Sequence, residues 1–174
     1  KTGTIESDIS VEPAANYLIF TVTPEKEPYP VVCVTYHGAK AFCVAGGFRL
    51  PSDAEWEKAA RGKEAFAYPW GNAMPDKDFL NYKDVIGDTT EVGKYPRGAS
   101  LYRALDMAGN VWEWCHSLYK AYPYDLTDGR EDEASRGFRV LRGGSWASMP
   151  MKIRAAFRDG TSPHDSGDFI GFRV

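Results

Sequence analysis

Two carboxylates that flank a glycine-containing loop are the residues of this sequence best suited to hold a metal ion. Asp106 and Glu113 stand on either side of residues 108–111, which read AGNV. Carboxylate and backbone carbonyl oxygens are the hard ligands that calcium takes, so the spacing permits a calcium site. The alternative is a loop without metal, in which Asp106 and Glu113 accept hydrogen bonds from backbone N–H groups.

Imidazole and thiol chemistry has less support. No histidine lies three or four residues from another histidine or from a cysteine, so the sequence has no zinc motif; the histidines are His37, His116 and His164. An odd number of widely spaced cysteines cannot form a complete disulfide framework. We expect small buried apolar residues at these positions, Cys33, Cys43 and Cys115.

A hydrolase triad is not supported either. Ser145 has His164, Asp165 and Asp168 in the same third of the chain, but no nucleophile elbow surrounds the serine. Proximity in sequence without that turn carries no prediction of covalent catalysis.

Two helices are expected to position these groups. The small and apolar residues between 37 and 44 predict a short helix that ends at the glycine pair 46–47. Ser52 and Glu55 have the spacing of a capping box, and Gly62 can close the helix that follows, so we predict a helix over residues 52–61.

The remaining chain predicts short strands and many irregular loops. Strands or extended segments are expected at 17–23, 31–36, 138–141, 152–157 and 170–174, and the last three predict an antiparallel sheet. Glycine, proline and asparagine recur between residues 62 and 98, which favours loops. Residues 125–137 are charged and read as a mobile surface loop without chemistry. These elements predict an α+β fold in a single domain, residues 1–174.

Composition excludes several classes of function. The chain has 174 residues, of which 43% are hydrophobic and 14% aromatic, values typical of a globular protein. A net charge of −3 without a cluster of lysine or arginine argues against nucleic acid as a partner. Every apolar run is far shorter than the roughly 20 residues of a membrane-spanning helix, so we expect no membrane insertion.

Four segments in a fixed order carry a resemblance to a known family. They read FRLPSDAEWEKAARG (48–62), YPWGN (68–72), LDMAGNVWEW (105–114) and RGGSW (142–146), the last followed by a closing GFRV (171–174). Together they resemble the formylglycine-generating-enzyme, or sulfatase-modifying-factor, superfamily. The resemblance implies a C-type lectin-like fold, two helices around short antiparallel sheets with many irregular loops. Residues 1–30 match poorly and are interpreted as an N-terminal extension.

The resemblance also bears on calcium. In the family, the segment matching 106–113 binds a structural calcium through side chains at the positions of Asp106 and Glu113 and through carbonyls at those of Gly109 and Val111. A second family site begins near Asn81, but the loop that follows is shorter here. Both sites are therefore expectations carried over from the resemblance.

Catalysis by the family's known route is not expected. The formylglycine-generating enzymes bind copper with a cysteine pair just after the GGS segment, because a thiolate is both metal ligand and redox group. Residues 143–153 of this chain read GGSWASMPMKI and contain no cysteine; Ser148 and Ile153 fall near the places of the pair. We therefore expect no copper at this place and a protein that is not an enzyme.

The C-terminal segment, 142–174, is similar to the variable proteins of diversity-generating retroelements, several of which share this fold and end in a GFRV-like string. Adenine mutagenesis there yields residue types such as Ala, Ser, Phe, Asp, Thr and His, and most of the candidate residues belong to that set. Met149 and Lys152 do not belong to it, and they would need another template codon or lie outside the variable set. The candidate ligand-binding residues are Trp146, Ala147, Ser148, Met149, Lys152, Phe157, Asp159, Thr161, Ser162, His164, Asp165, Ser166, Asp168 and Phe169.

This similarity implies a ligand-binding protein with a diversified surface on a rigid scaffold. The partner would be an unknown protein or another macromolecule, and an outward-facing binder favours the cell surface, the extracellular space or a virion. Phe157 and Phe169 would be apolar anchors inside an acidic rim. Three alternatives stay open: an ordinary loop covering the sheet, a superfamily enzyme with unrecognised chemistry, and an inactive structural paralogue.

Overall fold

Two capped helices frame the fold. The computed structural model describes residues 4–7, 18–21 and 26–174. Helix α1 (Tyr36–Gly46) begins where the Thr35 hydroxyl accepts the Gly38 N–H, and it ends at Gly47, whose φ of 74° is left-handed. Helix α2 (Asp53–Arg61) has both hydrogen bonds of the predicted capping box between Ser52 and Glu55. Both helices lie where the sequence predicts them.

A four-stranded sheet in the order β5-β4-β3-β6 lies between the helices. Its strands are β3 (Trp112–Leu118), β4 (Arg139–Arg142), β5 (Asp159–Thr161) and β6 (Ile170–Phe172). Strands β3, β4 and β5 pair antiparallel, whereas β6 runs parallel to β3. The sheet is therefore mixed, not purely antiparallel as expected, because the chain crosses from β5 to the opposite edge before it forms β6. A separate antiparallel hairpin joins β1 (Thr4–Ser7) to β2 (Leu18–Thr21).

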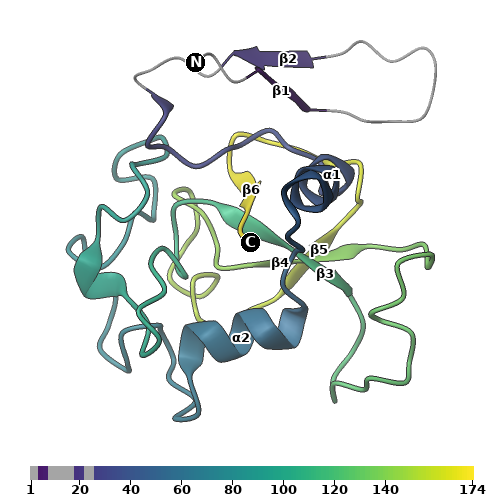
Figure 1. Cartoon of the computed structure of the whole chain (residues 1–174). Helices are drawn as coiled ribbons and strands as arrows, with labels where there is room; N and C mark the ends of the chain where they lie inside the picture. Colours follow the sequence, from purple (N-terminus) through teal and green to yellow (C-terminus); the bar gives the residue numbers. More distant parts are fainter. Residues whose placement is uncertain (1–3, 8–17, 22–25) are drawn as a thin grey trace.

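The two helices lie on opposite faces of the sheet, with α1 above and α2 below in Figure 1. Trp112 and Trp114 of β3 pack in one buried cluster with Tyr36, Ala39 and Cys43 of α1. The opposite face of the sheet carries Cys115 of β3 and Val140 of β4, which pack with Trp56 and Ala60 of α2. Because strand side chains point alternately to opposite faces, β3 serves both clusters. The expected α+β, C-type lectin-like class is confirmed.

Several predicted elements differ. Residues 31–35 form no strand, because Cys33 has a left-handed φ of 58° and α1 already starts at Tyr36. Residues 152–157 are consecutive turns, in which Lys152 donates to Met149 O and Phe157 to Arg154 O. Of the expected strand 17–23, residues 17, 22 and 23 lie outside the described part of the chain, and 18–21 form β2.

The charged segment 125–137 is tied to the fold and is not simply a surface loop. The Arg130 side chain is 1% exposed and pairs with Asp128 at 2.8 Å. It also donates to the carbonyls of Ala121 and Pro123. A buried arginine that binds main-chain carbonyls fixes the loop around it.

Among the described residues, no helix is both long and apolar enough to span a bilayer.

Candidate ligand-binding face

The RGGSW string turns the chain sharply at the end of β4. Gly144 has a φ of 73°, and a Cβ at this position would lie 2.8 Å from Cγ2 of Ile153, so a larger residue would displace the packed isoleucine. The turn is closed by the Ser145 N–H, which donates to Ser148 Oγ at 2.9 Å. It is joined to the 106–113 loop by the Trp146 N–H, which donates to Asn110 O at 2.8 Å. The buried framework therefore delivers residues 146–169 to the surface.

Most of the candidate binding residues are accessible. The exposed ones, together with the half-buried Trp146, Asp159, Thr161 and Ser162, are called the C-terminal face below; they are Ala147, Met149, Lys152, His164, Asp165, Ser166, Asp168 and Phe169. Phe169 is 40% exposed and Met149 57%. Trp146 is linked to the far end of the segment, because its Nε1–H donates to Asp168 O at 3.4 Å.

Two candidates are corrected by their burial. Ser148 is buried, and its hydroxyl accepts the Ser145 N–H, so it closes a turn and does not offer a contact to a ligand. Phe157 is half-buried and packs against the α1 cluster, with its ring centroid 6.1 Å from that of Trp112. Of the two expected aromatic anchors, Phe169 alone is exposed.

The charges of the face are partly paired. Lys152 Nζ lies 3.6 Å from Asp159 Oδ2. Asp165 accepts hydrogen bonds from the Thr161 hydroxyl and the Ser162 N–H. Asp168 lies close enough to Cys33 to add to the effect of burial, which is the larger cause raising the pKa of that thiol. Cys33 is therefore held protonated and is a poor nucleophile.

The fold brings together two histidines that are far apart in sequence. The rings of His37, at the start of α1, and His164 lie with centroids 5.0 Å apart. No group of three or more His, Cys, Asp or Glu side chains suited to a metal occurs among the described residues. Spacing along the chain gives no sign of this contact, because the two histidines come from different elements.

The first expected calcium site does not fit a calcium ion in this arrangement of side chains. Glu113 Oε1 accepts from Arg173 Nη2 at 2.6 Å, and Glu113 Oε2 accepts from Arg173 Nε at 2.6 Å and from Trp56 Nε1 at 2.5 Å. A cation beside Glu113 would therefore meet the guanidinium of Arg173. Asp106 accepts the Gly93 N–H at 2.7 Å. The geometry favours the alternative, a hydrogen-bonded loop.

The loop keeps its shape through Gly109. Its φ is 74°, and a Cβ there would lie 2.2 Å from Asn81 O, which accepts the neighbouring Asn110 N–H. Glycine is thus required by close contact with the Asn81 backbone. Val111 is buried beside it.

The second expected calcium position has an oxygen available. Asn81 is 2% exposed, its Nδ2 donates to Asp88 O at 2.8 Å, and its Oδ1 is buried without a partner. A buried amide oxygen that accepts no hydrogen bond lowers the stability of the fold, and such oxygens are ligands that calcium binds. Asn81 Oδ1 therefore fits the ion in question, and calcium at this position stays a prediction.

The places of the family's cysteine pair are filled by packed residues. Ser148 and Ile153 are both buried and both face Gly144. Cys43 and Cys115 are buried as expected, and Cys33 is half-buried. Ser145 is buried, and its hydroxyl lies 3.3 Å from Ser148 Oγ.

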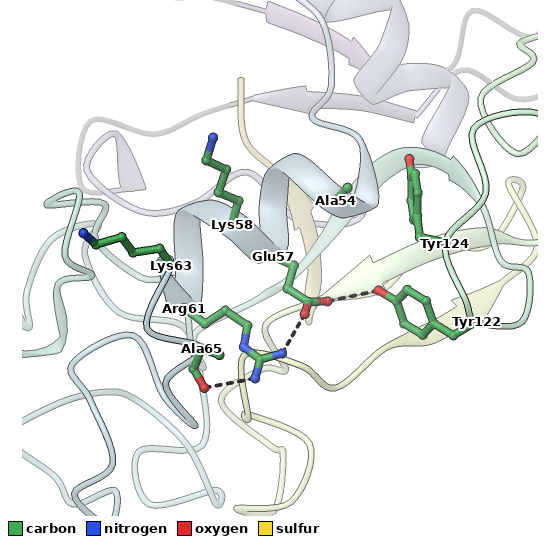
Figure 2. Close-up of a pocket in the computed structure, with 9 residues that line it drawn as sticks. Ala54, Glu57, Lys58, Arg61, Lys63, Ala65, Tyr122 and Tyr124 are labelled. Carbon is green, nitrogen blue, oxygen red and sulfur yellow. Dashed lines mark hydrogen bonds and ion pairs between the residues drawn. The ribbon is translucent and has the colours of Figure 1, made fainter.

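A groove of about 450 Å³ lies beside α2 (Figure 2), and none of the candidate binding residues lines it. Tyr122 donates to Glu57 Oε2 at 3.0 Å, and Arg61 donates to Glu57 Oε1 at 2.8 Å. Burial opposes the ionisation of Glu57, but hydrogen bonds from Arg61 and Arg142 outweigh it and hold its pKa below the ordinary value. The groove's carboxylate is thus already neutralised by its own arginines.

The loop that follows Asn81 adjoins the C-terminal face. Asp84 N–H donates to Trp146 O at 2.7 Å, and Lys83 N–H donates to Ser148 O at 3.0 Å. Val85 and Ile86 follow directly and are exposed. Two adjacent apolar residues inside a polar loop are the sequence signal that could have indicated this surface.

The fold and the framework define a C-type lectin-like protein. The model of the Sulfatase-modifying factor enzyme 1-like domain matches residues 20–174. The chain therefore belongs to this family, and the match begins ten residues before the point expected from the motifs.

Curated relatives carry different names. The chain is 40% identical over 158 residues to the serine/threonine-protein kinase Pkn1 of Chlamydia trachomatis, covering 87% of this chain and 25% of that protein. It is 38% identical to the hercynine oxygenase of Mycolicibacterium smegmatis (83% and 37% covered) and 38% identical to the inactive C-alpha-formylglycine-generating enzyme 2 of Bos taurus (86% and 50%). The chain thus spans between a quarter and a half of the length of these relatives.

These relatives overturn the expectation that the chain is not an enzyme. Three hercynine oxygenases, enzymes by name, match at 37–38% identity. The expectation failed because the missing cysteine pair bears on thiol–copper chemistry alone, and one fold can carry several chemistries.

Among solved structures, Treponema denticola variable protein 1 superposes with a TM-score of 0.71 at 27% identity, covering 83% of this chain and 70% of that one. The U1 variant of the Major Tropism Determinant, 20% identical with a TM-score of 0.51, shows the shared fold.

Proposed function

We propose that the chain is a ligand-binding variable protein of a diversity-generating retroelement, with the C-terminal face as its diversified surface. The observation that carries the proposal is the contrast within one segment. Residues 142–145 and 170–171 are buried in the framework, whereas the side chains between them are exposed or half-buried except for Ser148, Ile153 and Ala155. Similarity to Treponema denticola variable protein 1 supports it.

The physical case is that hydrogen bonds between backbone atoms hold the face at several points. Trp146 is held by the bond from its N–H to Asn110 O. The Cys33 N–H donates to Gly167 O at 2.9 Å. Side chains between such points can change with little effect on the fold, and a surface organised beforehand loses less entropy on binding.

The partner is a macromolecule, and an outward-facing location on a cell surface, in the extracellular space or on a virion suits such a binder. The face offers an exposed aromatic ring, Phe169, and an exposed methionine, Met149, residue types that are enriched in protein interfaces. Calcium near Asn81 would act as a structural ion for the adjoining loop.

The test is a nucleotide comparison. The proposal expects a near-identical template repeat beside a reverse-transcriptase gene, with differences from the 142–174 coding segment confined to adenines of the template. Absence of the repeat from the genome contradicts it.

An enzyme of the family with chemistry other than thiol–copper oxidation is the second candidate, favoured by the hercynine oxygenase relatives. The chain covers 37% of that relative, so its activity is not transferred residue by residue. The same genomic comparison separates the two candidates, because an enzyme's face would have no template repeat.

A further inference from the structure

The groove beside α2, called the α2 groove below, shares no residue with the C-terminal face. Figure 2 shows Tyr122 and Tyr124 on one side of it, α2 on the other, and Glu57 between them. Its volume of about 450 Å³ is in the range of small-molecule sites, and its walls combine aromatic rings with a few charged side chains, as such sites do. The α2 groove thus has the size and composition of a site for a small ligand.

The tyrosine wall of the groove is held in place. Tyr122 is fixed by its hydrogen bond to the groove's carboxylate, and the hydroxyl of Tyr124 donates to Glu131. The guanidinium of Arg158 lies 4.5 Å from the ring centre of Tyr122, and that of Arg130 lies 4.4 Å from the ring centre of Tyr124. Because hydrogen bonds and cation–π contacts fix both rings, a ligand ring that packs on them meets a surface organised beforehand.

The charges that line the groove are unequal in number. Glu57 is the one carboxylate among the lining residues, against three cations, Lys58, Arg61 and Lys63. Arg61 donates to Glu57 at 2.8 Å and offsets its charge. Lys58 has no carboxylate partner among the described residues, and Lys63 has Glu64 at 3.9 Å with both side chains exposed, a geometry that contributes little. Two lysines are therefore left to offer positive charge to a ligand.

The carboxylates next to the tyrosine wall do not line the groove and have partners of their own. Asp128 pairs with Arg130 at 2.8 Å. Glu131 accepts hydrogen bonds from Ser117 and Tyr124. A ligand in the groove would therefore meet the two lysines and not these acids. A site of this sign attracts a ligand of the opposite sign.

We propose that the α2 groove binds a small aromatic phosphate monoester, with its ring against Tyr122 and Tyr124 and its phosphate at Lys58 and Lys63. A phosphate monoester carries about −1.5 to −2 charge at pH 7, which matches the two lysines, and lysine binds phosphate as a point charge. Both lysines are exposed, and their long side chains can turn towards the phosphate. The inference goes beyond the proposed function, because all lining residues lie between positions 54 and 124, outside the segment 142–174.

The experiment measures the binding of phenyl phosphate to the full chain by calorimetric titration at about pH 7.5, where the phosphate is largely dianionic. Four proteins are compared: wild type, Lys58→Gln with Lys63→Gln, Ala54→Phe, and Lys77→Gln with Lys94→Gln. Ala54 is exposed and lines the groove, so a phenylalanine there occupies it. Lys77 and Lys94 are exposed outside the groove and are the matched control for the loss of two positive charges. Because all substituted residues are exposed, the midpoint of urea unfolding should be unchanged, and this is measured first.

We expect one site for phenyl phosphate, with affinity lowered about tenfold or more by the Lys58 and Lys63 variant and by Ala54→Phe, and changed less than about twofold in the control. Phenol and inorganic phosphate, which each carry one part of the ligand, should bind at least about tenfold more weakly than phenyl phosphate.

Four outcomes contradict parts of this expectation or all of it. Inorganic phosphate that binds as tightly as phenyl phosphate contradicts the contact with the tyrosine wall, and benzoate that binds as tightly contradicts the choice of phosphate. Equal weakening in the Lys77 and Lys94 variant shows attraction by net charge alone and no site in the groove. No binding of phenyl phosphate to wild type at millimolar concentration overturns the proposal, and it leaves the proposed function of the C-terminal face unaffected.

Discussion

Arg173 and Glu113 form a two-pronged ion pair that joins the last residues of the chain to the centre of the sheet. Nε and Nη2 of the arginine each lie 2.6 Å from a different carboxylate oxygen, and Trp56 of α2 donates to the same carboxylate. Glu113 belongs to the WEW string and Arg173 to the GFRV string. Two of the strings that carry the family resemblance thus meet in one contact.

Loss of this pair should be strongly destabilising. Glu113→Ala leaves a guanidinium and an indole N–H without their acceptor, and we expect a loss of about 3 kcal/mol in the free energy of unfolding, measured with urea. The control is Arg49→Ala, which breaks the exposed pair with Glu55 and should cost less than about 1 kcal/mol. Equal losses for the two variants would contradict the structural role of the Glu113 pair.

A second buried arginine should resist even conservative replacement. Arg142 is fully buried, with Nε 2.5 Å from Asp53 Oδ1 and Nη1 donating to the carbonyls of Ala155 and Phe157. Arg142→Lys keeps the charge but cannot make these bonds together. We expect a loss of about 3 kcal/mol or more in the free energy of unfolding. A lysine variant as stable as wild type would refute the need for the guanidinium.

The sequence predicts well what depends on local pattern. The capping box of Ser52 and Glu55 and the left-handed Gly47 set both helices from neighbouring residues. It predicts poorly what depends on distant partners. Strand β3 is buried on both faces, so WEWCHSL lacks the alternation of a half-buried strand, and β5 is three residues long.

The candidate site divides in the same way. Exposure of Met149 and Phe169 follows from their place between framework strings. Burial of Ser148 depends on its bond to the Ser145 N–H. The contact between residues 83–84 and residues 146–148 joins positions 62 or more apart in the chain. Similarly, the pairing of Glu113 with Arg173 could not be predicted from local sequence, because the two residues are 60 positions apart.

The pH dependence of stability should reveal the environment of Asp106. Burial is the main cause that raises its pKa, and Glu113 adds to it, while the Gly93 N–H and Arg173 act in the opposite direction. The folded state therefore binds this proton more tightly than the unfolded chain does. The contribution of protonated Asp106 to the free energy of unfolding is fully present below the unfolded pKa of about 3.9. It is lost as pH rises through the higher pKa of the folded state.

Asp106→Asn keeps an acceptor for Gly93 and removes the titration. In buffer with a calcium chelator, the variant should be more stable than wild type at pH 7, and the difference should shrink towards pH 3. Urea unfolding of both proteins across this range gives the measurement. If the variant is less stable than wild type by the same amount at every pH, the direction of the pKa shift is contradicted.

Calcium should stabilise the protein through Asn81. An ion at its unpartnered Oδ1 would satisfy a buried oxygen, and a ligand at 100 times its dissociation constant adds about 2.7 kcal/mol to the free energy of unfolding. We expect calcium, but not magnesium at the same concentration, to raise the Tm of wild type. The Tm of Asn81→Ala should be the same with and without calcium. Asn72→Ala is the control, because Asn72 Oδ1 already accepts the Ala67 N–H. The same calcium increment in Asn81→Ala would exclude this residue as a ligand.

Substitution of two serines from the same segment should change stability to very different extents. Ser166 is exposed on the C-terminal face, whereas Ser148 is buried and closes the turn after Gly144. Ser166→Asp should change the free energy of unfolding by less than about 0.5 kcal/mol. Ser148→Asp places a negative charge in a buried site where the Ser148 hydroxyl contacts only Ser145, and it should cost about 3 kcal/mol. Thermal and urea unfolding of the two variants measure this difference.

If Ser166→Asp proves as damaging as Ser148→Asp, the face is part of the framework and a diversified surface is ruled out at that position. If both are tolerated, the turn does not need Ser148 and the diversified set extends further into the fold.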